Sequence, residues 1–427
     1  MTSFDPARPQ EFLDALMHAA IAAADPLKVV PPYLPPPPKG RTIVIGAGKG
    51  SAAMAKAVEA NWPDDRLSDL EGVVVTRYGY AVACDRIKII EAAHPMPDDA
   101  GRQAAREILA AAEGLGPDDL CIALISGGAS ALLSYPAAGI SFDDKQEVNR
   151  LMLRSGATIS EMNCVRKHLS AIKGGYLAKA VQPARLVTLL ISDVPGDDPG
   201  VIGSGPTVPD STTFTEARHI IAKYGIELPP AVSAHLDAAE TETPKPGDRL
   251  FDHTETHMVA RPQASLDAAI AVAREAGIEP VVLGDALEGE AREVARLHAE
   301  QARGMKESAE IGPRLVLSGG ELTVTIKGEG RGGPNAEYML GMALALDGEP
   351  GIFALAIDTD GVDGSEDNAG ARIGPDTLSQ AAGAEVDAGT MLELNDSYGF
   401  FQAVNGLVMT GPTFTNVNDF RAVLVLS

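Results

Sequence analysis

Short apolar runs alternate along the chain with amphipathic stretches. Helical patterns lie between several of the runs, as at 99–114 and 265–276. Strands that alternate with helices predict α/β structure with parallel sheets and right-handed crossovers. In such sheets ligands bind outside the carboxyl ends of the strands. Gly, Ser and Asp residues stand at the carboxyl ends of the apolar runs. Each run and its polar end lie within one of the ranges 42–51, 121–130, 186–198, 315–323, 353–364 and 407–416.

A polar, proline-interrupted stretch near 240–250 marks the expected domain boundary. It predicts an N-terminal α/β domain over 1–240, with helices on both faces of a parallel sheet, and a smaller C-terminal α/β domain over 250–427. The sequences SGGAS at 126–130 and SGGEL at 318–322 indicate that each half contributes one glycine-lined turn.

The first polar turn reads GAGKGS, at residues 46–51, directly after the apolar run 42–45. Glycines that end a strand, followed by Lys49 and the start of a helix, are typical of a site that holds an anion. A Walker loop needs glycine where Ile43 stands, and a dinucleotide-binding turn needs a third glycine where Ser51 stands. The turn is therefore expected to bind phosphate or carboxylate without belonging to either class.

The charge balance limits what the chain can bind. The 59 acidic residues outnumber the 35 basic ones, and the net charge of −24 disfavours nucleic acid and anionic membranes as partners. The three cysteines are isolated, no run of 18 apolar residues occurs, and no basic segment precedes the first helical stretch. These features predict a cytoplasmic enzyme for a small molecule, and they leave a homodimer open.

Basic side chains gather at three places. Lys49 lies between glycines, where a ligand can approach the backbone. Arg166, Ser170 and Lys173 recur at i, i+4 and i+7 of a helix predicted over 163–175, so we expect them to share one face. In an acidic protein that face is expected to meet an anionic substrate rather than solvent. Arg331 stands among four glycines and suits stabilisation of a transferring phosphoryl group.

Acidic residues end two of the apolar runs. Asp193 and Asp360 are the stronger candidates, because a carboxylate at a strand end can hold Mg²⁺ or accept a proton from a hydroxyl. Asp197 and Asp198 are interpreted as turn residues. The sequence DTDGVDG at 358–364 starts like a calcium loop, but its register fails at the third ligand position. His253 and His257 are weak evidence for a metal, because no third ligand lies near them in the sequence.

These residues fit two classes of enzyme. A phosphotransferase would use the glycine turns for phosphates, Lys49 and Arg331 for developing charge, and Asp193 as base. A nicotinamide-dependent reductase would use 46–51 as a dinucleotide turn. The strand at 72–76 should then end in an acid, but Thr76 and Arg77 stand there, which excludes the usual NAD arrangement and leaves an NADP variant. A protein that binds partners through its proline-rich segment would leave the polar strand ends unexplained.

Six motifs together carry a resemblance to a known family. They are VIGAGKGSAAMA, LISGGASALLSYP, NCVRKHLSAIKGGYLA, LISDVPGDDPGVIGSGPTVPD, LSGGELTVTIKGEGRGGPN and LAIDTDGVDG, in this order. The chain resembles the MOFRL-type glycerate 2-kinase family from about residue 10 to residue 427. The resemblance implies a Rossmann-like glycerate kinase domain over 1–240, a MOFRL domain over 250–427, and an active site in the cleft between them. Because many members are called hydroxypyruvate reductases, an NAD(P)H-dependent hydroxypyruvate reductase is the alternative.

The activity implied is ATP- and Mg²⁺-dependent phosphorylation of D-glycerate at its 2-hydroxyl, giving 2-phosphoglycerate and ADP. The family's important lysine corresponds to Lys49. Its important arginine lies in a loop that many members write GRGGRNQE. Here the loop reads GRGGPNAE, with Pro334 and Ala336, so Arg331 is the arginine available in it.

The roles expected on this basis follow from residue type and placement. Arg166 or Lys173, with Ser170 beside them, holds the glycerate carboxylate, and Asp193 orients or deprotonates the 2-hydroxyl. Lys49 and Arg331 neutralise the transition state. Asp360 and Asp193 are the expected Mg²⁺ ligands. The residues expected to bind ATP are Gly46, Gly48, Ser126, Gly127, Gly128, Ser130 and Asn335.

Overall fold

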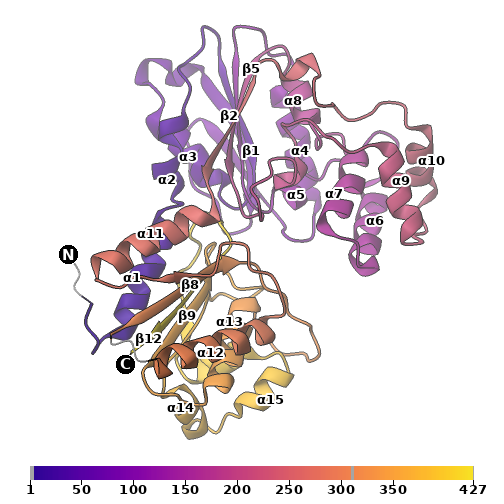
Figure 1. The fold of residues 1–427 in the computed structure, drawn as a ribbon. Helices are drawn as coiled ribbons and strands as arrows, with labels where there is room; N and C mark the ends of the chain where they lie inside the picture. Colours follow the sequence, from indigo (N-terminus) through magenta and orange to yellow (C-terminus); the bar gives the residue numbers. More distant parts are fainter. Residues whose placement is uncertain (1–3, 309–311, 427) are drawn as a thin grey trace. The chain divides into compact units, whose positions relative to one another are not determined.

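The computed structural model describes residues 4–308 and 312–426, and the chain divides into two compact units (Figure 1). Residues 26–259 form one, here called the central unit. The chain up to residue 25 and from residue 260 onward forms the other, the terminal unit. Among the described residues, no helix is long and apolar enough to cross a membrane.

The central unit is built on a six-stranded sheet with the strand order β3-β2-β1-β4-β5-β6. The pairs among the first five strands are all parallel, which confirms the predicted parallel sheet. This order is that of the doubly wound dinucleotide-binding fold. The strands are β1 (Thr42–Ala47), β2 (Leu70–Arg77), β3 (Ile87–Ala92), β4 (Leu120–Ile125), β5 (Arg185–Ile191) and β6 (Thr254–Ala260).

Helices cover both faces of this sheet, with α3 on one side and α4 and α8 on the other (Figure 1). Alternate side chains of the strands, such as Ile43 and Ile45, enter one core with Ala104, Ile108 and Leu177 from α4 and α8. The helices packed on the sheet or leading into it are α2 (Pro26–Val29), α3 (Ser51–Asn61), α4 (Asp99–Ala112), α5 (Ala129–Leu132) and α8 (Tyr176–Val181).

Four further helices of the central unit form their own small core beside the sheet. Val148 and Met152, Val165, and Phe214 are buried there together. Local sequence sets where three of these helices begin, because each starts with a capping box: Ser141 with Asp144, Thr158 with Glu161, and Thr213 with Glu216. The helices are α6 (Phe142–Ser155), α7 (Ile159–His168), α9 (Phe214–Lys223) and α10 (Pro230–Ala238).

The terminal unit has a second six-stranded sheet, of order β11-β10-β9-β12-β8-β7. Its β12 runs antiparallel to both β8 and β9, and β10 antiparallel to β9, so the prediction of parallel strands is wrong for this unit. The cause is that apolar runs carry no signal of strand direction, and that β12, which lies outside the predicted runs, pairs between β9 and β8. The strands are β7 (Val281–Val282), β8 (Arg314–Gly320), β9 (Ile352–Asp358), β10 (Gly370–Ile373), β11 (Leu407–Val408) and β12 (Asp419–Val425).

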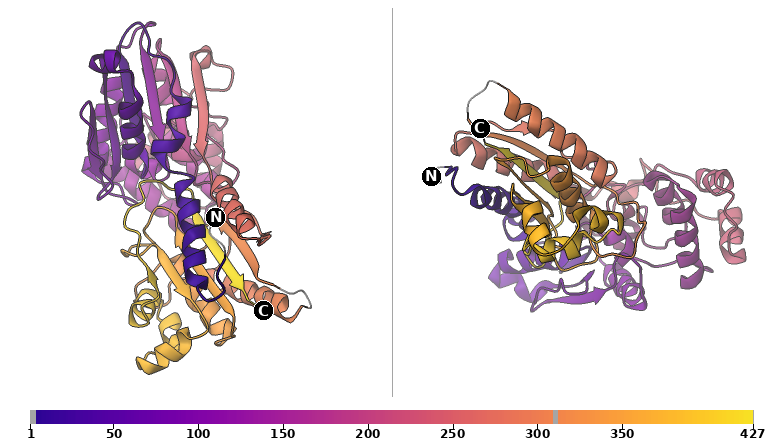
Figure 2. Two further views of the ribbon diagram at one scale, coloured as in Figure 1. Left: turned by 90° about the vertical axis from the view of Figure 1, so that its left-hand side faces the viewer. Right: turned by 90° about the horizontal axis from the view of Figure 1, so that it is seen from below.

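Helices also cover this sheet on both sides. Leu13 and Leu16 of α1 and Leu266 of α11 share a core with Leu355 and Phe420 of the strands. A separate core joins the sheet to α12 and α13. Figure 2 shows α1, in indigo, lying along the yellow strand β12. The helices are α1 (Pro9–Ala22), α11 (Pro262–Glu275), α12 (Ala291–Glu307), α13 (Pro334–Leu346), α14 (Thr377–Gly383), α15 (Ala388–Glu393) and α16 (Ser397–Ala403).

This division differs from the expected domains 1–240 and 250–427 at both ends. The first helix belongs to the terminal unit, because its apolar face packs there and Ser265 Oγ donates a 2.7 Å hydrogen bond to the Ala20 carbonyl. The second boundary falls at 259/260, because β6 extends the central sheet beside β5. A polar stretch predicts a break in secondary structure, but it does not say which sheet the next strand joins.

Candidate functional site

The glycine turn after β1 is bound to its own unit through its backbone. The amides of Gly48, Lys49 and Gly50 donate to the carbonyl of Val75 (3.1 Å), the carbonyl of Gly127 (2.8 Å) and Ser126 Oγ (2.9 Å). The amide of Ser51 donates to the Gly48 carbonyl, at 3.2 Å. These N–H groups are therefore used inside the protein and do not form the anion cradle expected of this turn.

The same contacts revise the roles expected for neighbouring residues. Gly46 lies in β1, where an added Cβ would come within 2.4 Å of the Leu124 carbonyl oxygen, so strand packing requires a glycine there. Gly48 is needed for a similar reason, because a Cβ would meet Ser126 Oγ at 2.2 Å. Ser126 is fully buried and fixes the turn after β1. Gly46, Gly48 and Ser126 thus shape the strand ends, and the contacts that they make are with protein.

Gly128 brings two other side chains together. Its φ of +83° suits glycine, and a Cβ there would lie 3.0 Å from His94 Cδ2 and 3.5 Å from Lys49 Cγ. Lys49 therefore reaches the turn after β4, beside His94. Gly128 and His94 both line a cavity of about 290 Å³ in the central unit.

The cavity lies between the turn after β4 and the helices α6 and α7. Its volume is at the lower end of the range of small-molecule sites. Apolar side chains from Val148, Met152, Val165 and Leu169 cover part of the wall. The polar side chains that line it are His94, Ser130, Ser134, Lys145, Gln146, Asn149, Arg166 and Lys173.

Three basic side chains converge on the cavity: Lys145 from α6, Arg166 from α7, and Lys173 from the loop after α7. Among the described residues that line it, none is Asp or Glu. Lys145 and Lys173 are almost completely buried. A chain with a net charge of −24 thus has a cavity lined by basic groups without an acid among the described residues, which is chemically suited to an anion.

Burial sets the protonation of these groups. It lowers the pKa of Lys145 to about 7, with the positive charge of Arg166 adding to the effect. Burial also holds the pKa of Lys173 well below its ordinary value, and the charges of Lys145 and Arg166 lower it further. An anion bound beside Lys145 would raise the pKa of that lysine again, because it stabilises the charged form.

Each basic group is held by a neutral acceptor. Lys145 Nζ donates to the Tyr135 carbonyl (3.2 Å), and Arg166 Nε donates to Asn149 Oδ1 (2.8 Å). Lys173 Nζ donates to the Ser130 carbonyl (2.6 Å) and to Ser130 Oγ (3.3 Å). The three side chains are therefore positioned before any ligand binds, without losing charge to a carboxylate.

The expected helical face of Arg166, Ser170 and Lys173 does not form, because α7 ends at His168. The hydroxyl of Ser170 accepts from the amides of Ile172 and Lys173, both at 3.3 Å, and donates to the Tyr135 carbonyl. Ser170 thus stabilises the turn that carries Lys173, and it does not line the cavity. Arg166 and Lys173 still meet, across the cavity.

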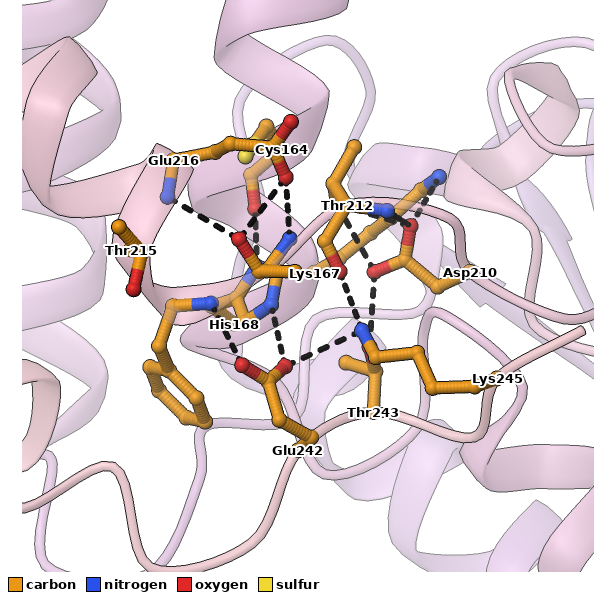
Figure 3. Close-up of polar contacts among 12 residues, drawn as sticks. Cys164, Lys167, His168, Asp210, Thr212, Thr215, Glu216, Glu242, Thr243 and Lys245 are labelled. Atoms are coloured by element: carbon orange, nitrogen blue, oxygen red, sulfur yellow. Dashed lines mark hydrogen bonds and ion pairs between the residues drawn. The ribbon is translucent and has the colours of Figure 1, made fainter.

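A polar network fixes the opposite side of α7 (Figure 3). Lys167 Nζ lies 3.2 Å from Asp210 Oδ1, and His168 Nε2 lies 3.3 Å from Glu242 Oε2. Glu242 also pairs with Lys245, at 3.1 Å. Burial alone would raise the pKa of Asp210, but Lys167 and nearby hydroxyl and amide donors outweigh it and lower the pKa. The Lys167–Asp210 ion pair and the His168–Glu242 contact thus hold in place the helix that carries Arg166.

Asp193 follows β5 and is half-buried, but it does not line the cavity. Asp198 accepts a 2.8 Å hydrogen bond from the Gly200 amide, and Asp197 has a φ of +54°. Both geometries agree with the turn interpretation of these two residues.

The candidates of the terminal unit have contacts of their own. Arg331 is exposed, lies over the ring of Tyr398 at 4.5 Å from its centroid, and is 3.4 Å from Glu366 Oε2. Asn335 is buried and donates its side-chain N–H groups to Asp363 and Asp419. Asn335 therefore has an internal partner on each side.

Asp360 is fully buried, and its Oδ1 accepts a 2.8 Å hydrogen bond from the Val362 amide. Among the described residues, no three His, Cys, Asp or Glu side chains are grouped as metal ligands. Mg²⁺ bound to a nucleotide needs one or two carboxylates beside phosphates and water. Half-buried Asp193 fits that limited role better than Asp360.

Comparison with known proteins gives a consistent picture. A family model described as "Domain of unknown function (DUF4147)" matches residues 12–237, and the MOFRL family model matches residues 314–419. A "D-glycerate 2-kinase" of Thermotoga maritima is 36% identical over 99% of this chain and 100% of its own. The crystal structure of a glycerate kinase from the same organism aligns with a TM-score of 0.87 at 35% identity, covering 98% of this chain and 100% of that one.

The chain belongs to the glycerate 2-kinase family. It is also similar to a "Putative hydroxypyruvate reductase" of Agrobacterium vitis, with 54% identity over 97% of this chain and 94% of the relative. In this member of the glycerate 2-kinase family, the glycine-rich loop that carries Arg331 also contains Pro334. Pro334 is the first residue of α13, where its missing N–H leaves no bond unmade.

Sequence reasoning missed Lys145. In α6 it lies at i, i+3 and i+7 with Val148 and Met152, which form the buried stripe of that helix. A lysine inside an apolar stripe is costly to bury, and that cost was the available signal. His94, which follows β3, also lines the cavity.

Proposed function

We propose that this protein is a glycerate 2-kinase, which transfers the γ-phosphoryl group of ATP to the 2-hydroxyl of D-glycerate and gives 2-phosphoglycerate and ADP. The observation that carries the proposal is the cavity with three basic side chains and no acidic lining among the described residues. A small 2-hydroxy acid has one carboxylate to meet those charges and a hydroxyl beside it to react.

Arg166 and Lys145 suit the carboxylate best. The guanidinium of Arg166 offers a planar set of donors that matches a carboxylate, and its Nε is already fixed by Asn149. Lys145 lies in the same cavity and adds a second charge-assisted hydrogen bond. Apolar side chains on part of the wall lower the local dielectric constant, which strengthens both contacts.

Lys49, Arg331, Asn335 and Asp360 keep their expected roles as proposals, and Asp193 keeps its expected role as a Mg²⁺ ligand. Lys49 is supported by its place beside Gly128 and His94. Asp193 is supported as a Mg²⁺ ligand by its place at the carboxyl end of β5. Mg²⁺ supplies charge neutralisation of the nucleotide phosphates when it is bound.

The alternative is an NAD(P)H-dependent hydroxypyruvate reductase. Two observations favour it: the strand order of the central sheet and the name of the Agrobacterium vitis relative. The turn after β1 argues against a reductase. A dinucleotide pyrophosphate would need the backbone amides of Gly48 to Ser51, and these amides donate to acceptors inside the protein. β2 also ends in Thr76 and Arg77, without an acid for the ribose.

Two assays on one preparation separate the functions. The first follows ADP release with D-glycerate, ATP and Mg²⁺, and the second follows NADH and NADPH oxidation with hydroxypyruvate. We expect glycerate-dependent ADP release and no nicotinamide oxidation. Turnover in the second assay without ADP release in the first would reject the kinase in favour of the reductase.

A further inference from the structure

Lys173 is bound at the cavity by a chain of hydroxyl groups whose directions can be worked out. Ser204 Oγ donates to Asn163 Oδ1 at 3.1 Å, so its proton is used there. The 2.8 Å contact between Ser130 Oγ and Ser204 Oγ must then have Ser130 as the donor. With its own proton committed, Ser130 Oγ can only accept from Lys173.

This chain fixes two positions on the lysine nitrogen. Lys173 Nζ donates one N–H to the Ser130 carbonyl at 2.6 Å and a second to Ser130 Oγ at 3.3 Å. An amine nitrogen has one further position, which holds a lone pair when the group is neutral and a third N–H when it is charged. Lys173 lines the cavity, so that position is available to a ligand there.

The surroundings favour the neutral amine at Lys173. Its cavity also contains Lys145, Arg166 and His94, Lys49 lies close by at Gly128, and no acid lines it among the described residues. Arg166 stays charged at any working pH. Burial lowers the pKa of Lys173, and the charges of Lys145 and Arg166 lower it further. Of these groups, Lys173 is the one best suited to accept a proton rather than to pair with an anion.

We infer that Lys173 is the catalytic base, which accepts the proton of the substrate 2-hydroxyl during phosphoryl transfer. The inference rests on the proposed function. The O–H bond breaks, its proton joins the Lys173 nitrogen, and the oxygen forms a bond to the γ-phosphorus. The bond from that phosphorus to the β–γ bridging oxygen breaks and leaves ADP. The Lys173 ammonium then releases its proton to water.

This assignment differs from the expected base, Asp193, which does not line the cavity, and from a role for Lys173 in holding the carboxylate. Ser130 becomes a positioning residue, because it orients the amine through its carbonyl and hydroxyl. Three assignments can be distinguished: Lys173 as the base, Asp193 as the base, and Lys173 as an anchor of the carboxylate. They predict different outcomes when charge and basicity at residue 173 are changed separately.

The test compares Lys173→Met and Lys173→Arg with the wild type. Methionine cannot accept a proton, and arginine carries a permanent charge and cannot accept one either, so both variants should lower kcat by at least about 10²-fold. The KM for D-glycerate should stay within about threefold, because the carboxylate contacts remain. Melting temperature and calorimetric binding of D-glycerate confirm that each variant is folded. A Lys173→Arg enzyme with near wild-type kcat would overturn the inference and make the residue an anchor.

A wild-type measurement covers the case in which neither variant folds. The kcat should rise with pH with a slope of one as Lys173 loses its proton, and it should then level off, also in Asp193→Asn. If the rise of kcat with pH is lost in Asp193→Asn, the base is Asp193 and the inference fails. Failure of the proposed function is distinct, because the wild type would then show no glycerate-dependent ADP release.

Discussion

Replacement of Lys145 by methionine is the most informative change in the cavity wall. Methionine keeps the length and apolar stem of the side chain, so α6 should still pack through Val148 and Met152. The change removes one charged donor to the substrate carboxylate, a contact worth about 1.5–3 kcal/mol. The KM for D-glycerate should rise by about 10- to 10²-fold. The kcat should change little, because the contact is equal in the ground state and the transition state.

The pKa of Lys145 adds a pH dependence with a definite sign. The group is charged below its pKa of about 7 and neutral above it, so binding of an anion weakens as the pH rises through that value. If the bound substrate keeps Lys145 protonated, the KM should increase by up to about 50-fold between pH 7 and pH 9. Lys145→Arg holds its charge and should keep a low KM at pH 9.

The assay is ADP release against D-glycerate concentration from pH 6 to pH 9, for the wild type, Lys145→Met and Lys145→Arg. The reasoning requires a KM that rises with pH in the wild type and loses this dependence in both variants. A KM that neither pH nor Lys145→Met alters would show that the carboxylate binds elsewhere.

Three further predictions concern single residues. Lys49→Ala should lower kcat more than it raises KM and leave the melting temperature unchanged, because backbone bonds hold its turn; a wild-type rate would remove Lys49 from the mechanism. Gly128→Ala should destabilise the protein by about 1–3 kcal/mol in denaturant unfolding, since its φ is +83° and a Cβ would press on His94; unchanged stability would contradict this geometry. Asp363→Ala removes the acceptor of two amides at the start of α13 and should cost about 1–2 kcal/mol by calorimetry, whereas exposed Glu275→Ala should cost almost nothing; equal effects would refute the capping role.

The parallel sheet of the central unit could be predicted because β1 and β4 are largely apolar runs, buried along their whole length, and helices separate the strands. The direction of β12 could not be predicted from the sequence. Its apolar residues are buried on both faces and would read alike in a parallel strand. Strand direction depends on the path of the preceding loop, which leaves no periodic signal in the sequence.

The end of α7 shows a second limit. The pattern at 163–175 continues at helical spacing, but Ser170 binds the amides of Ile172 and Lys173 and offers the backbone an alternative to the helix. Arg166 and Lys173 nevertheless reach the same cavity, so the predicted pair was found through a wrong local structure.

The glycine turn at 46–51 shows why a motif alone does not define an anion site. Its composition predicts open amides at the start of α3, and those amides exist. Their acceptors, the carbonyl of Gly127 and the hydroxyl of Ser126, come from a turn about 80 residues later and fill the site. Only tertiary structure shows which helix starts are available to a ligand.

The position of phosphate in the product tests the central claim most directly. Wild-type protein is incubated with D-glycerate, ATP and Mg²⁺, and the product is identified by ³¹P NMR against authentic 2- and 3-phosphoglycerate. We expect 2-phosphoglycerate, formed together with an equal amount of ADP. A product phosphorylated at the 3-hydroxyl, or no phosphoglycerate in a preparation that reduces hydroxypyruvate, would contradict the account.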